Sequence, residues 1–573
     1  MRIGRVDVTI TKKSQINQER KLKQHHRSDT TMCKNTLSVN LDISTSSFSS
    51  DTDQPIRNEF CTNKIKDVIP VQKMKKVSCI DLPTVSKTCG RYGVSDRAAA
   101  AIVSSVLHDI WSEVEVIDRS KLSRERTKTR QELLKQVNIR DISALYFEER
   151  KDTTLKVIRK GNRNYRKVVV EEHISLIQEP GSTYLGYVVP HIGSAKGIVS
   201  SIKAFLEQQS IFKNDLMAIG CDGTNVNTGK NEGIIRLLEK QFNKPLQWII
   251  CLLHMDELPL RHLFFHLDGS TSGPKSYNSP IGKVLENCEE LPVIKFQKIE
   301  GDMLPDMTDD LSTDQKYLHR IVTVIISGTF PDDLGHKSPG KLSHARWLTR
   351  ANRLLRLYVA TENPTSPLVT LATFIIKVYA PSWFEIKNKP SCKDGSHHLF
   401  KIIFLSRFLP EDLKCIVDTV IQRNGYFAHS ENLLLAMITD ERKHIRELAA
   451  RRILKARSNA VQTPRLFDIP KINFHASNYI DIINWQKEIT EPPIFKNLST
   501  EEISYIVQSG GEGQLSFLRL PCHTQAVERA VKIKTEAAIS QCTIKSRLGS
   551  IKAKLESRTK MPKFDTKCHF KPN

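Results

Sequence analysis

The chain has 573 residues, of which 39% are hydrophobic, so it is long enough for roughly three or four domains with cores of their own. Its net charge of +23 and pI of about 9.4 favour a polyanionic partner such as nucleic acid, although a basic surface that only aids solubility stays open. The twelve cysteines include no C-x-x-C pair, and no segment is typical of a signal peptide or a membrane span. We therefore expect no zinc finger, no disulfide scaffold and no membrane partner, in a reducing intracellular compartment.

Residues 1–90 are polar, basic and Ser-rich, which predicts a disordered N-terminal region. The basic clusters KKSQINQERKLKQHHR and SKLSRERTKTR are of the kind that directs nuclear import, so we expect a nuclear protein. The first firm helix is expected near Ser95, whose hydroxyl can cap the Ala-rich segment after it. A small helical domain over 91–138 follows from this pattern.

Extended segments then dominate, beginning with the alternating sequence ISALYFEER at 142–150. Further apolar extended segments follow at 154–160, 167–177, 183–192, 216–223 and 247–254. Helical spacing appears at 197–209 and again after each of the last two strands. The order of three strands, helix, strand, helix, strand, helix predicts an α/β, RNase H-like fold, in which helices cover both faces of a mixed sheet. We assign its first part to 139–270.

From about 310 to 460 nearly every segment has helical spacing. We therefore predict an all-α insertion domain over 271–510. The segment 511–550 is expected to return to the RNase H-like core as its final part, and 551–573 to form a basic C-terminal tail.

Two acidic residues stand where such a fold would need them. RNase H-type nucleases and transposases use three or four carboxylates, which hold two divalent ions at the scissile phosphate. Asp222 follows the strand AIGC and begins D-G-T-N, which is also an ordinary helix-capping turn. Glu528 lies at the beginning of a helix, where a surface ion pair with Lys532 is the other interpretation.

Four motifs occur together in this order: CDGTNVNTGKNEGIIRLLE, the C-x-x-H of Cys251 and His254, HARW at 344–347, and HTQAVER at 523–529. Over roughly residues 140–550 the chain thereby resembles hAT superfamily transposases, in a divergent form like those of invertebrate genomes. The resemblance implies an RNase H-like fold split by a large helical insertion before the last catalytic Glu. It also implies that Glu148, Asp222 and Glu528 are catalytic and bind Mg²⁺ or Mn²⁺.

The chain departs from the family in two respects. It lacks the family's N-terminal zinc finger, and Glu148 stands where the family has an Asp on its first strand. The additional methylene displaces the carboxylate by over about an ångström, and a misplacement of that size can cost roughly 100-fold in rate. Asp152, four residues further on, is an alternative first acid.

Other residues are candidates for contacts to a metal or to DNA. Cys251 and His254 have zinc-like spacing, but a structural site needs four ligands, so a packed pair is the other interpretation. The family uses a Trp of the insertion to stack on a flipped base; Trp347 after Arg346 takes this position, with a core Trp as the alternative. A basic helix could line a phosphate groove or be a solvated face. Its cations are Arg442, Arg446, Arg451, Arg452 and Lys455.

The sequence therefore predicts a transposase-derived protein that binds double-stranded DNA, with metal-dependent cleavage and strand transfer impaired by Glu148. We expect no small-molecule substrate and leave a homo-oligomer open. Two alternatives remain at this point: a domesticated, non-catalytic module that binds DNA or protein, and an unrelated cytosolic α/β enzyme.

Overall fold

The computed structural model describes residues 81–110, 116–135, 142–209, 216–269, 279–306, 311–342, 347–458, 468–486, 498–510 and 519–560. The chain divides into a unit of residues 1–78 and a unit of residues 79–573, and all described residues belong to the second. Most of the region 1–90, which we expected to be disordered, thus lies outside the described residues, and so does the whole basic cluster KKSQINQERKLKQHHR.

Three helices begin the described chain: α2 (Pro83–Tyr92), α3 (Asp96–Ile110) and α4 (Arg119–Lys135). Ser95 Oγ accepts a hydrogen bond from Ala98 N (3.1 Å), as expected for the start of α3. Helix α2 begins inside the segment that we expected to be disordered, because Leu82 and Cys89 are buried against Leu122. The second basic cluster forms part of α4.

The described residues form one five-stranded mixed sheet in the order β3-β2-β1-β4-β5. Its strands are β1 (Ala144–Lys160), β2 (Arg163–Glu179), β3 (Thr183–Val188), β4 (Ala218–Cys221) and β5 (Gln247–Ile250). Strands β1, β2 and β3 are antiparallel neighbours, whereas β4 and β5 run parallel to β1. The extended segment expected at 154–160 is not a separate strand, because β1 pairs with β2 without interruption as far as Lys160.

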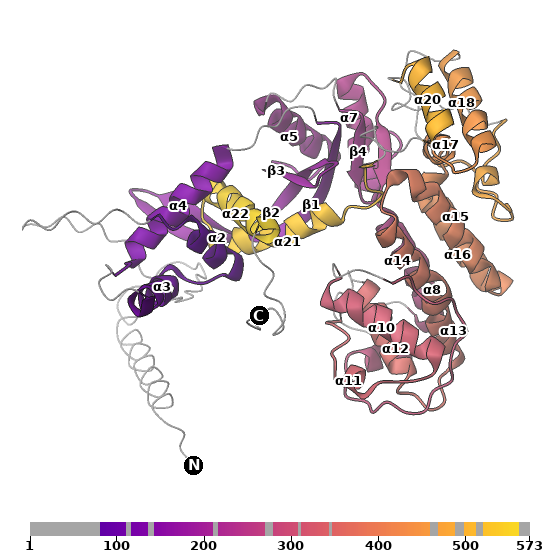
Figure 1. Ribbon diagram of the computed structural model, residues 1–573, viewed down its shortest axis with the longest axis horizontal. Coiled ribbons are helices and arrows are strands. Elements are labelled where there is room, and N and C mark those ends of the chain that lie inside the picture. The colour runs from indigo at the N-terminus through magenta and orange to yellow at the C-terminus, as the bar shows by residue number, and fades with distance from the viewer. Residues whose placement is uncertain are drawn as a thin grey trace, which may run out of the picture. The chain divides into compact units, whose positions relative to one another are not determined.

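Two hydrophobic clusters cover the two faces of the sheet. On one face, Leu145, Phe147 and Trp248 pack with helices α5 (Ala195–Gln208) and α7 (Ile234–Phe242). Helix α5 follows β3, and α7 follows β4 after the one-turn helix α6 (Asn225–Thr228). On the other face, Tyr146 and Ala218 pack with helices α8 (Leu252–Asp268) and α21 (Gln525–Ser540). Figure 1 shows α21, in yellow, beside β1 and β2. The chain is thus an α/β protein.

Among its described residues, the region between α8 and α21 consists of helices joined by turns and irregular segments, and its β-pairing is limited to one isolated bridge between Ser391 and Pro521. Its helices are α9 (Pro280–Leu285), α10 (Thr313–Ser327), α11 (Asp332–Gly335), α12 (Trp347–Tyr358), α13 (Ser366–Phe374), α14 (Ala380–Asn388), α15 (Gly395–Leu405), α16 (Glu411–Asn424), α17 (Ser430–Ile438), α18 (Lys443–Ser458) and α20 (Thr500–Ser509). Short turns join them at η2 (Cys392–Asp394), η3 (Ser406–Phe408), η4 (Tyr426–Ala428) and η5 (Tyr479–Asp481). Their buried side chains belong to the same cluster as Tyr146 on the sheet, so the helical region and this sheet face share one core.

The helix Ser366–Asn388 is long and apolar enough to cross a membrane, by length and composition only, with a mean hydropathy of 1.3. It runs continuously through α13, the π-helical turn η1 (Ile375–Tyr379) and α14. Our expectation that no segment would reach this length was wrong. Because 72% of its most apolar 18-residue window is buried, the helix also has the properties of a core helix in a soluble protein.

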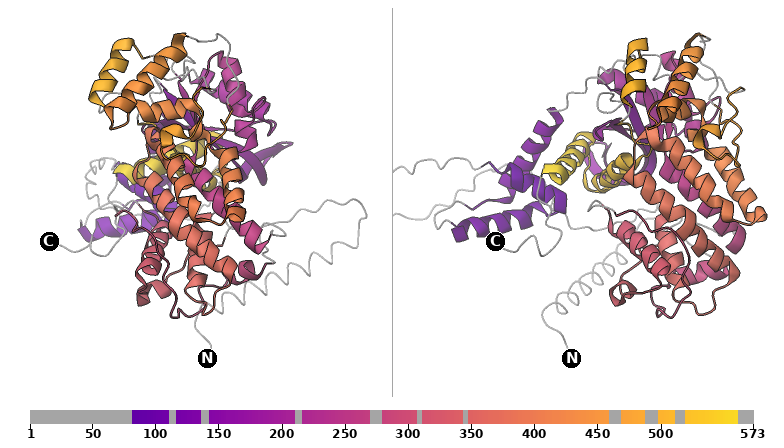
Figure 2. Two further views of the ribbon diagram at one scale, coloured as in Figure 1. Left: turned by 90° about the vertical axis from the view of Figure 1, so that its right-hand side faces the viewer. Right: turned by 45° about the vertical axis from the view of Figure 1, so that its right-hand side comes forward.

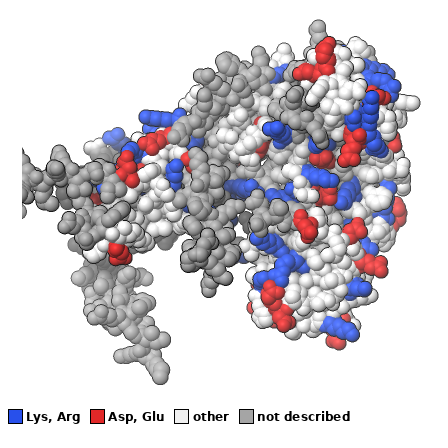
Figure 3. Space-filling view, viewed as in Figure 1, with Lys and Arg blue, Asp and Glu red and all other residues white. Residues whose placement is uncertain are grey.

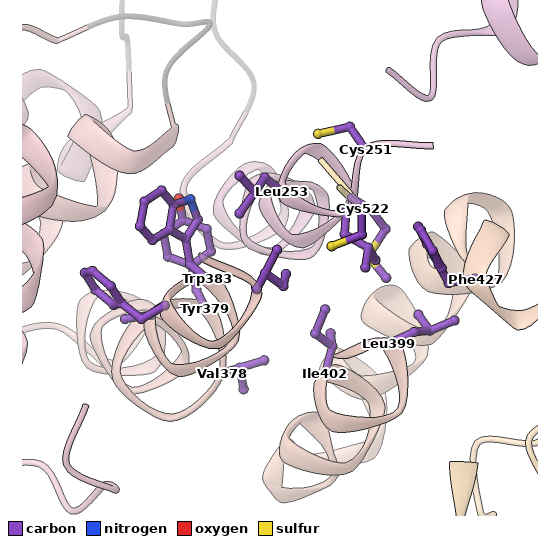
Figure 4. Packing of buried hydrophobic residues seen from close by; sticks show 14 of the residues in the cluster. Cys251, Leu253, Val378, Tyr379, Trp383, Leu399, Ile402, Phe427 and Cys522 are labelled. Carbon is purple, nitrogen blue, oxygen red and sulfur yellow. The ribbon is translucent and has the colours of Figure 1, made fainter. Parts of the chain in front are cut away.

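The chain returns from the helical region to the sheet through residues 519–524, which backbone hydrogen bonds hold on two sides. Leu252 N donates to Cys522 O (2.9 Å), and Cys522 N donates to Pro390 O (2.7 Å). Figure 4 shows Cys522 near Cys251, among helices that carry Leu399 and Phe427. This returning segment places the start of α21 beside the end of β5.

Helix α22 (Ile544–Lys560) follows α21 and packs against α2 and α4. Both views of Figure 2 show the yellow C-terminal helices in contact with the violet part of the chain. The boundary that we expected at residue 550 therefore falls inside a helix, because Ile551 and Ala553 are buried. Residues 561–573 lie outside the described part.

Candidate active site

Glu148 and Asp222 are level with each other on neighbouring parallel strands. The register of β1 and β4 joins Ala144 to Ala218, an offset of 218 − 144 = 74 positions. The same offset joins Glu148 to Asp222, since 222 − 148 = 74, although Asp222 is one residue beyond β4. Neighbouring strands lie about 4.8 Å apart. The two carboxylates therefore start from adjacent points at the carboxyl end of β4.

The alternation of side chains along β1 determines which of the adjacent acids Glu148 and Glu149 lies on the same sheet face as α21. Side chains of Tyr146 and Glu148 point to the sheet face covered by α21, whereas Phe147 and Glu149 point to the face of α5 and α7. Glu149 lies beside Glu172, and burial followed by this contact raises the pKa of Glu149 to about 7. Glu148 is therefore the acid of the α21 face, which agrees with its assignment from the family resemblance.

Helix α21 is fixed on β1 by a buried polar cluster around Asp152. The carboxylate of Asp152 contacts Lys534 Nζ (2.5 Å) and accepts a hydrogen bond from Thr535 Oγ1 (2.8 Å). It also contacts His173 Nδ1 (3.0 Å) from β2. Asp152 is 2% exposed and fully engaged, so it does not serve as the alternative first acid that we considered.

The spacing of this contact places Glu528 close to Glu148. Glu528 and Thr535 are seven residues apart, which is two turns or about 10 Å along one side of a helix. Glu148 and Asp152 are four residues apart, or about 13 Å along β1. Because Thr535 is bonded to Asp152, a helix that runs along the strand presents Glu528 at the level of Glu148.

The beginning of α21 is fixed independently. Tyr146 Oη donates a 2.5 Å hydrogen bond to Pro521 O, and its ring lies against Gly220, where an added Cβ would be 2.6 Å from ring atoms. Thr524 N donates to Cys251 Sγ (3.4 Å). Gly220 is therefore required for the ring to cross β4, and the ring in turn holds the segment before Glu528.

The electrostatics of Glu148 reflect this arrangement. Burial, followed by the charges of Glu528 and Asp222, raises the pKa of Glu148 to about 8. Its Oε2 atom is buried and has no hydrogen-bond partner among the described residues. The charges of Glu528 and Asp222 thus both act on Glu148, although the three acids come from three distant segments.

Asp222 also has the capping role that we kept as its alternative. Its Oδ1 accepts hydrogen bonds from Thr224 N (3.2 Å), Thr224 Oγ1 (2.9 Å) and Asn227 Nδ2 (2.6 Å). These bonds order the D-G-T-N turn and fix the carboxylate. The second oxygen, Oδ2, accepts no hydrogen bond from the described residues and remains available for another ligand.

Sequence reasoning missed a fourth acid, Glu257, in the second turn of α8. Burial, followed by the charge of Glu528, raises the pKa of Glu257 to about 8, although Arg350 acts in the opposite direction. The neighbouring Asp256 is 2% exposed, and neither of its oxygens has a hydrogen-bond partner among the described residues. The adjacent acids after the C-x-x-H were the available signal, but they resemble an ordinary polar turn of a helix.

The C-x-x-H residues have different surroundings. Cys251 is 1% exposed, its thiol accepts the hydrogen bond from Thr524, and burial raises its pKa to about 12. Burial lowers the pKa of His254, while the charge of Asp222 acts in the opposite direction. Among the described residues, no three His, Cys, Asp or Glu side chains are already grouped around a common metal position. The surroundings of Cys251 favour the packed interpretation.

Neither a protein-family model nor a curated protein matches the chain. Among solved structures, the chain is similar to the Drosophila P element transposase strand transfer complex, with a TM-score of 0.31 and 10% sequence identity. The similarity covers 85% of this chain and 94% of that one. A likeness of this size does not establish a common fold.

Trp347 is a buried side chain. It is 3% exposed and packs edge-on against Phe264 and Phe265, with the guanidinium of Arg350 over its ring at 3.7 Å. This position favours the core interpretation of Trp347 over base stacking. Arg346 lies outside the described residues.

The basic helix α18 divides into structural and solvent-facing cations. Arg442 is paired with Asp440 (2.9 Å), and Arg446 is 7% exposed and donates to three backbone carbonyls. Arg452 lies over the ring of Trp485 at 4.0 Å. Arg442, Arg451 and Lys455 are exposed, but Arg442 is engaged by Asp440. Of the five cations that we expected to line a groove, Arg451 and Lys455 are thus the two that are exposed and have no ion pair with the described residues.

Positive charge is nevertheless prominent elsewhere on the described surface. In the face seen in Figure 3, Lys and Arg side chains predominate across the middle, and both signs mix over the right-hand side. The excess of 86 Lys and Arg over 63 Asp and Glu is therefore not confined to residues that the structure leaves out.

Proposed function

We propose that the chain is a transposase-like DNA-binding protein with an RNase H-like core, as in the hAT superfamily, and that it cuts DNA at the acids Glu148, Asp222 and Glu528. The observation that carries this proposal is the convergence of these three carboxylates on one sheet face. Without a bound cation, like charges at close range repel, so a fold that gathers them needs a reason to do so. The mixed sheet with its parallel strands β1, β4 and β5 supports the proposed core.

The residues present suit a hard divalent cation. Magnesium and manganese prefer carboxylate oxygens, and the charges of Glu528 and Asp222 both act on Glu148 near the carboxyl end of β4. Glu148 Oε2 is buried without a hydrogen-bond partner, and Asp222 Oδ2 is open on a carboxylate that its turn already orders. We propose these oxygens and Glu528 as the ligands, with rotation of the Glu side chains to close the site. When bound, such ions activate water and stabilise the leaving oxygen of a phosphodiester.

The protein's own contribution is to position these ligands. The hydrogen bonds from Thr224 and Asn227 orient Asp222, and the Asp152–Lys534 contact sets the position of α21 and hence of Glu528. The charge of Glu528 also acts on Glu257, which therefore belongs to the same electrostatic region. The surrounding excess of Lys and Arg would attract the DNA backbone.

The orientation of Glu148 favours a weakened enzyme over a protein that has lost the site. Glu148 has no ion pair within the described residues and lies in the field of the other two acids. A side chain that had left the site would instead point to the α5 face or pair with an Arg of the sheet. The remaining deficit is the additional methylene, which a substitution can remove.

A nicking assay on supercoiled and terminal-repeat DNA tests the proposal. With Mn²⁺ or Mg²⁺ we expect slow nicking by the unmodified chain and faster nicking by Glu148→Asp. Asp222→Asn and Glu528→Gln should abolish it, whereas Glu149→Gln, which changes the neighbouring acid on the opposite sheet face, should not. If Glu148→Asp is as inactive as Asp222→Asn, the chain is a non-cleaving binding module.

A further inference from the structure

The hairpin formed by β1 and β2 extends well beyond the rest of the sheet. Pairing of β1 with β4 ends at Tyr146, and pairing of β2 with β3 begins only at Ile174. The strands continue to Lys160 and Arg163, joined by Gly161 and Asn162. Gly161 has a φ of 61°, and a positive φ at the first loop residue alone is the pattern of a II′ turn. The result is a two-stranded ribbon, here residues 153–170.

The ribbon carries positive charge without any acid. Residues 153–170 contain six cations and no Asp or Glu. The cations are Lys156, Arg159, Lys160, Arg163, Arg166 and Lys167. Lys156 pairs with Glu171 at the base, and the other five have no ion pair with any described residue. The ribbon is therefore a concentrated positive surface.

Two of its cross-strand pairs oppose like charges. Lys156 is directly opposite Lys167, and Lys160 is directly opposite Arg163. Like charges at such positions destabilise a hairpin, whereas opposite charges stabilise it by tenths of a kcal/mol. Lys residues on an open strand edge can also serve to prevent aggregation. That role does not require the cations to face each other, so the arrangement is better explained by an anionic ligand that bridges the two strands.

Apolar side chains are interleaved with the cations and exposed. Tyr165 is 50%, Val168 59% and Val170 72% exposed. A surface that only maintained solubility would have little use for these side chains. Aromatic and aliphatic groups between cations suit a groove in which phosphates line the edges and bases the floor.

We propose that the ribbon inserts into the major groove of duplex DNA. This inference rests on the proposed function for its ligand, but it assigns a surface that the acids do not include. The major groove is about 12 Å wide and 8.5 Å deep and admits a two-stranded β-ribbon. The exposed part, from Lys156 to Lys160, spans about 13 Å, enough to reach the floor of the groove.

The ribbon also has a defined relation to the acids, since Glu148 lies on the same strand. Lys156 and Lys160 are 8 and 12 residues beyond Glu148, or about 26 and 40 Å along β1. One turn of duplex DNA is about 35 Å. The ribbon therefore contacts DNA roughly one turn from the phosphate at the acids and fixes the distance at which the chain holds its substrate.

Charge reversal separates binding from stability in this hairpin. Lys160→Glu and Lys167→Glu each replace a like-charge pair by an opposite-charge pair, so thermal stability should stay level or rise slightly. Binding of the full chain to a fluorescent duplex of about 30 base pairs should weaken roughly tenfold or more in the double variant. The log–log salt slope should decrease by about 2, one for each lost phosphate contact.

The matched control is the double variant Lys203→Glu with Lys240→Glu. It makes the same charge change on α5 and α7, which cover the sheet face opposite to α21 and lie outside the ribbon. We expect the control to keep the salt slope. If the unmodified chain binds duplex and the ribbon variant behaves like the control, the ribbon proposal is overturned and the proposed function stands. If the unmodified chain does not bind duplex, both are overturned. If binding depends on the ribbon but no variant nicks DNA, the cleavage proposal alone fails.

Discussion

Glu148 on β1 and Asp222 just beyond β4 share the 74-position offset that defines the parallel pairing of these strands. Their juxtaposition therefore follows from the sheet register, extended by one residue into the turn whose hydrogen bonds from Thr224 and Asn227 hold Asp222. A shift of one residue in that register would turn Glu148 to the face of α5 and α7. The predictions below test the parts of the structure that maintain this register and bring α21 to it.

Removing the charge of Glu148 should stabilise the metal-free protein in a pH-dependent manner. Its pKa is raised from 4.5 in the unfolded chain to about 8, so the folded state binds the proton more tightly. The cost of ionising it is absent below about pH 4.5, grows as the pH rises and is complete above about pH 8. Glu148→Gln should therefore unfold at the same temperature as the unmodified chain at pH 4.5. At pH 9 it should be more stable by about 1–3 kcal/mol.

Thermal unfolding in EDTA at the two pH values measures this effect. Glu172→Gln, a change on the opposite face, serves as a control for charge alone. A Glu148→Gln effect that is equal at both pH values would show that the carboxylate is not in the field of the other acids.

The contact between Lys534 and Asp152 should be essential for docking α21. Burial raises the pKa of Asp152, but bonds from His173 and Lys534 outweigh it, so the pKa lies well below its usual range. Lys534→Met leaves a buried carboxylate without its cation and should cost about 3–5 kcal/mol in the free energy of unfolding. Thr535→Val, which removes only a hydrogen bond, should cost about 1 kcal/mol.

Denaturant unfolding provides these values, and the double variant Asp152→Asn with Lys534→Met provides the coupling. We expect the double variant to be more stable than the sum of the two single changes predicts. Additive losses would mean that the two side chains do not depend on each other.

Gly220 should tolerate no side chain, because a Cβ there would be 2.6 Å from the ring of Tyr146. Gly220→Ala should destabilise the protein by about 1–3 kcal/mol, as other overpacked cores do. Tyr146→Phe keeps the ring and removes only its bond to Pro521, so its cost should be near 1 kcal/mol. Equal stability of Gly220→Ala and the unmodified chain would contradict the close packing of β1 on β4.

Trp347 should affect stability and leave DNA binding unchanged. Trp347→Ala should cost about 3–5 kcal/mol, since the ring is buried between Phe264 and Arg350. Trp347→Phe should restore most of that stability. If Trp347→Phe folds normally but binds or cleaves DNA less well, the ring contacts the nucleic acid and the base-stacking interpretation is restored.

Part of the sheet was predictable because strands depend on local patterns, whereas Glu148 was assigned from the family resemblance. Alternation located β1, and the position of Asp222 at the end of an apolar strand followed from sequence alone. The sequence predicted one extended segment as far as Arg150 and another from Thr154, but not that β1 is continuous through the residues between them, because that continuity depends on pairing with β2. It likewise assigned Arg442 and Arg446 to a groove, whereas Asp440 and backbone carbonyls bind them in the fold.

Contacts between distant segments account for the rest. The Asp152–Lys534 anchor joins residues 382 positions apart (534 − 152), and no periodicity indicates such a pair. Glu257 became a candidate only when the fold placed it in the field of Glu528. The sequence analysis did not single out the ribbon cations, because their face-to-face positions depend on the hairpin register.

Metal-directed cleavage of the protein backbone tests the convergence of the acids most directly. Fe²⁺ bound in place of Mg²⁺ reduces added hydrogen peroxide to hydroxyl radicals, with ascorbate to regenerate Fe²⁺, and these radicals cut the chain near the ion. The structure predicts cuts close to residues 148, 222 and 528 in the same preparation, all lost in Asp222→Asn and competed by Mg²⁺. Cuts at only one of these segments, or cuts that persist unchanged in Asp222→Asn, would contradict a shared metal site.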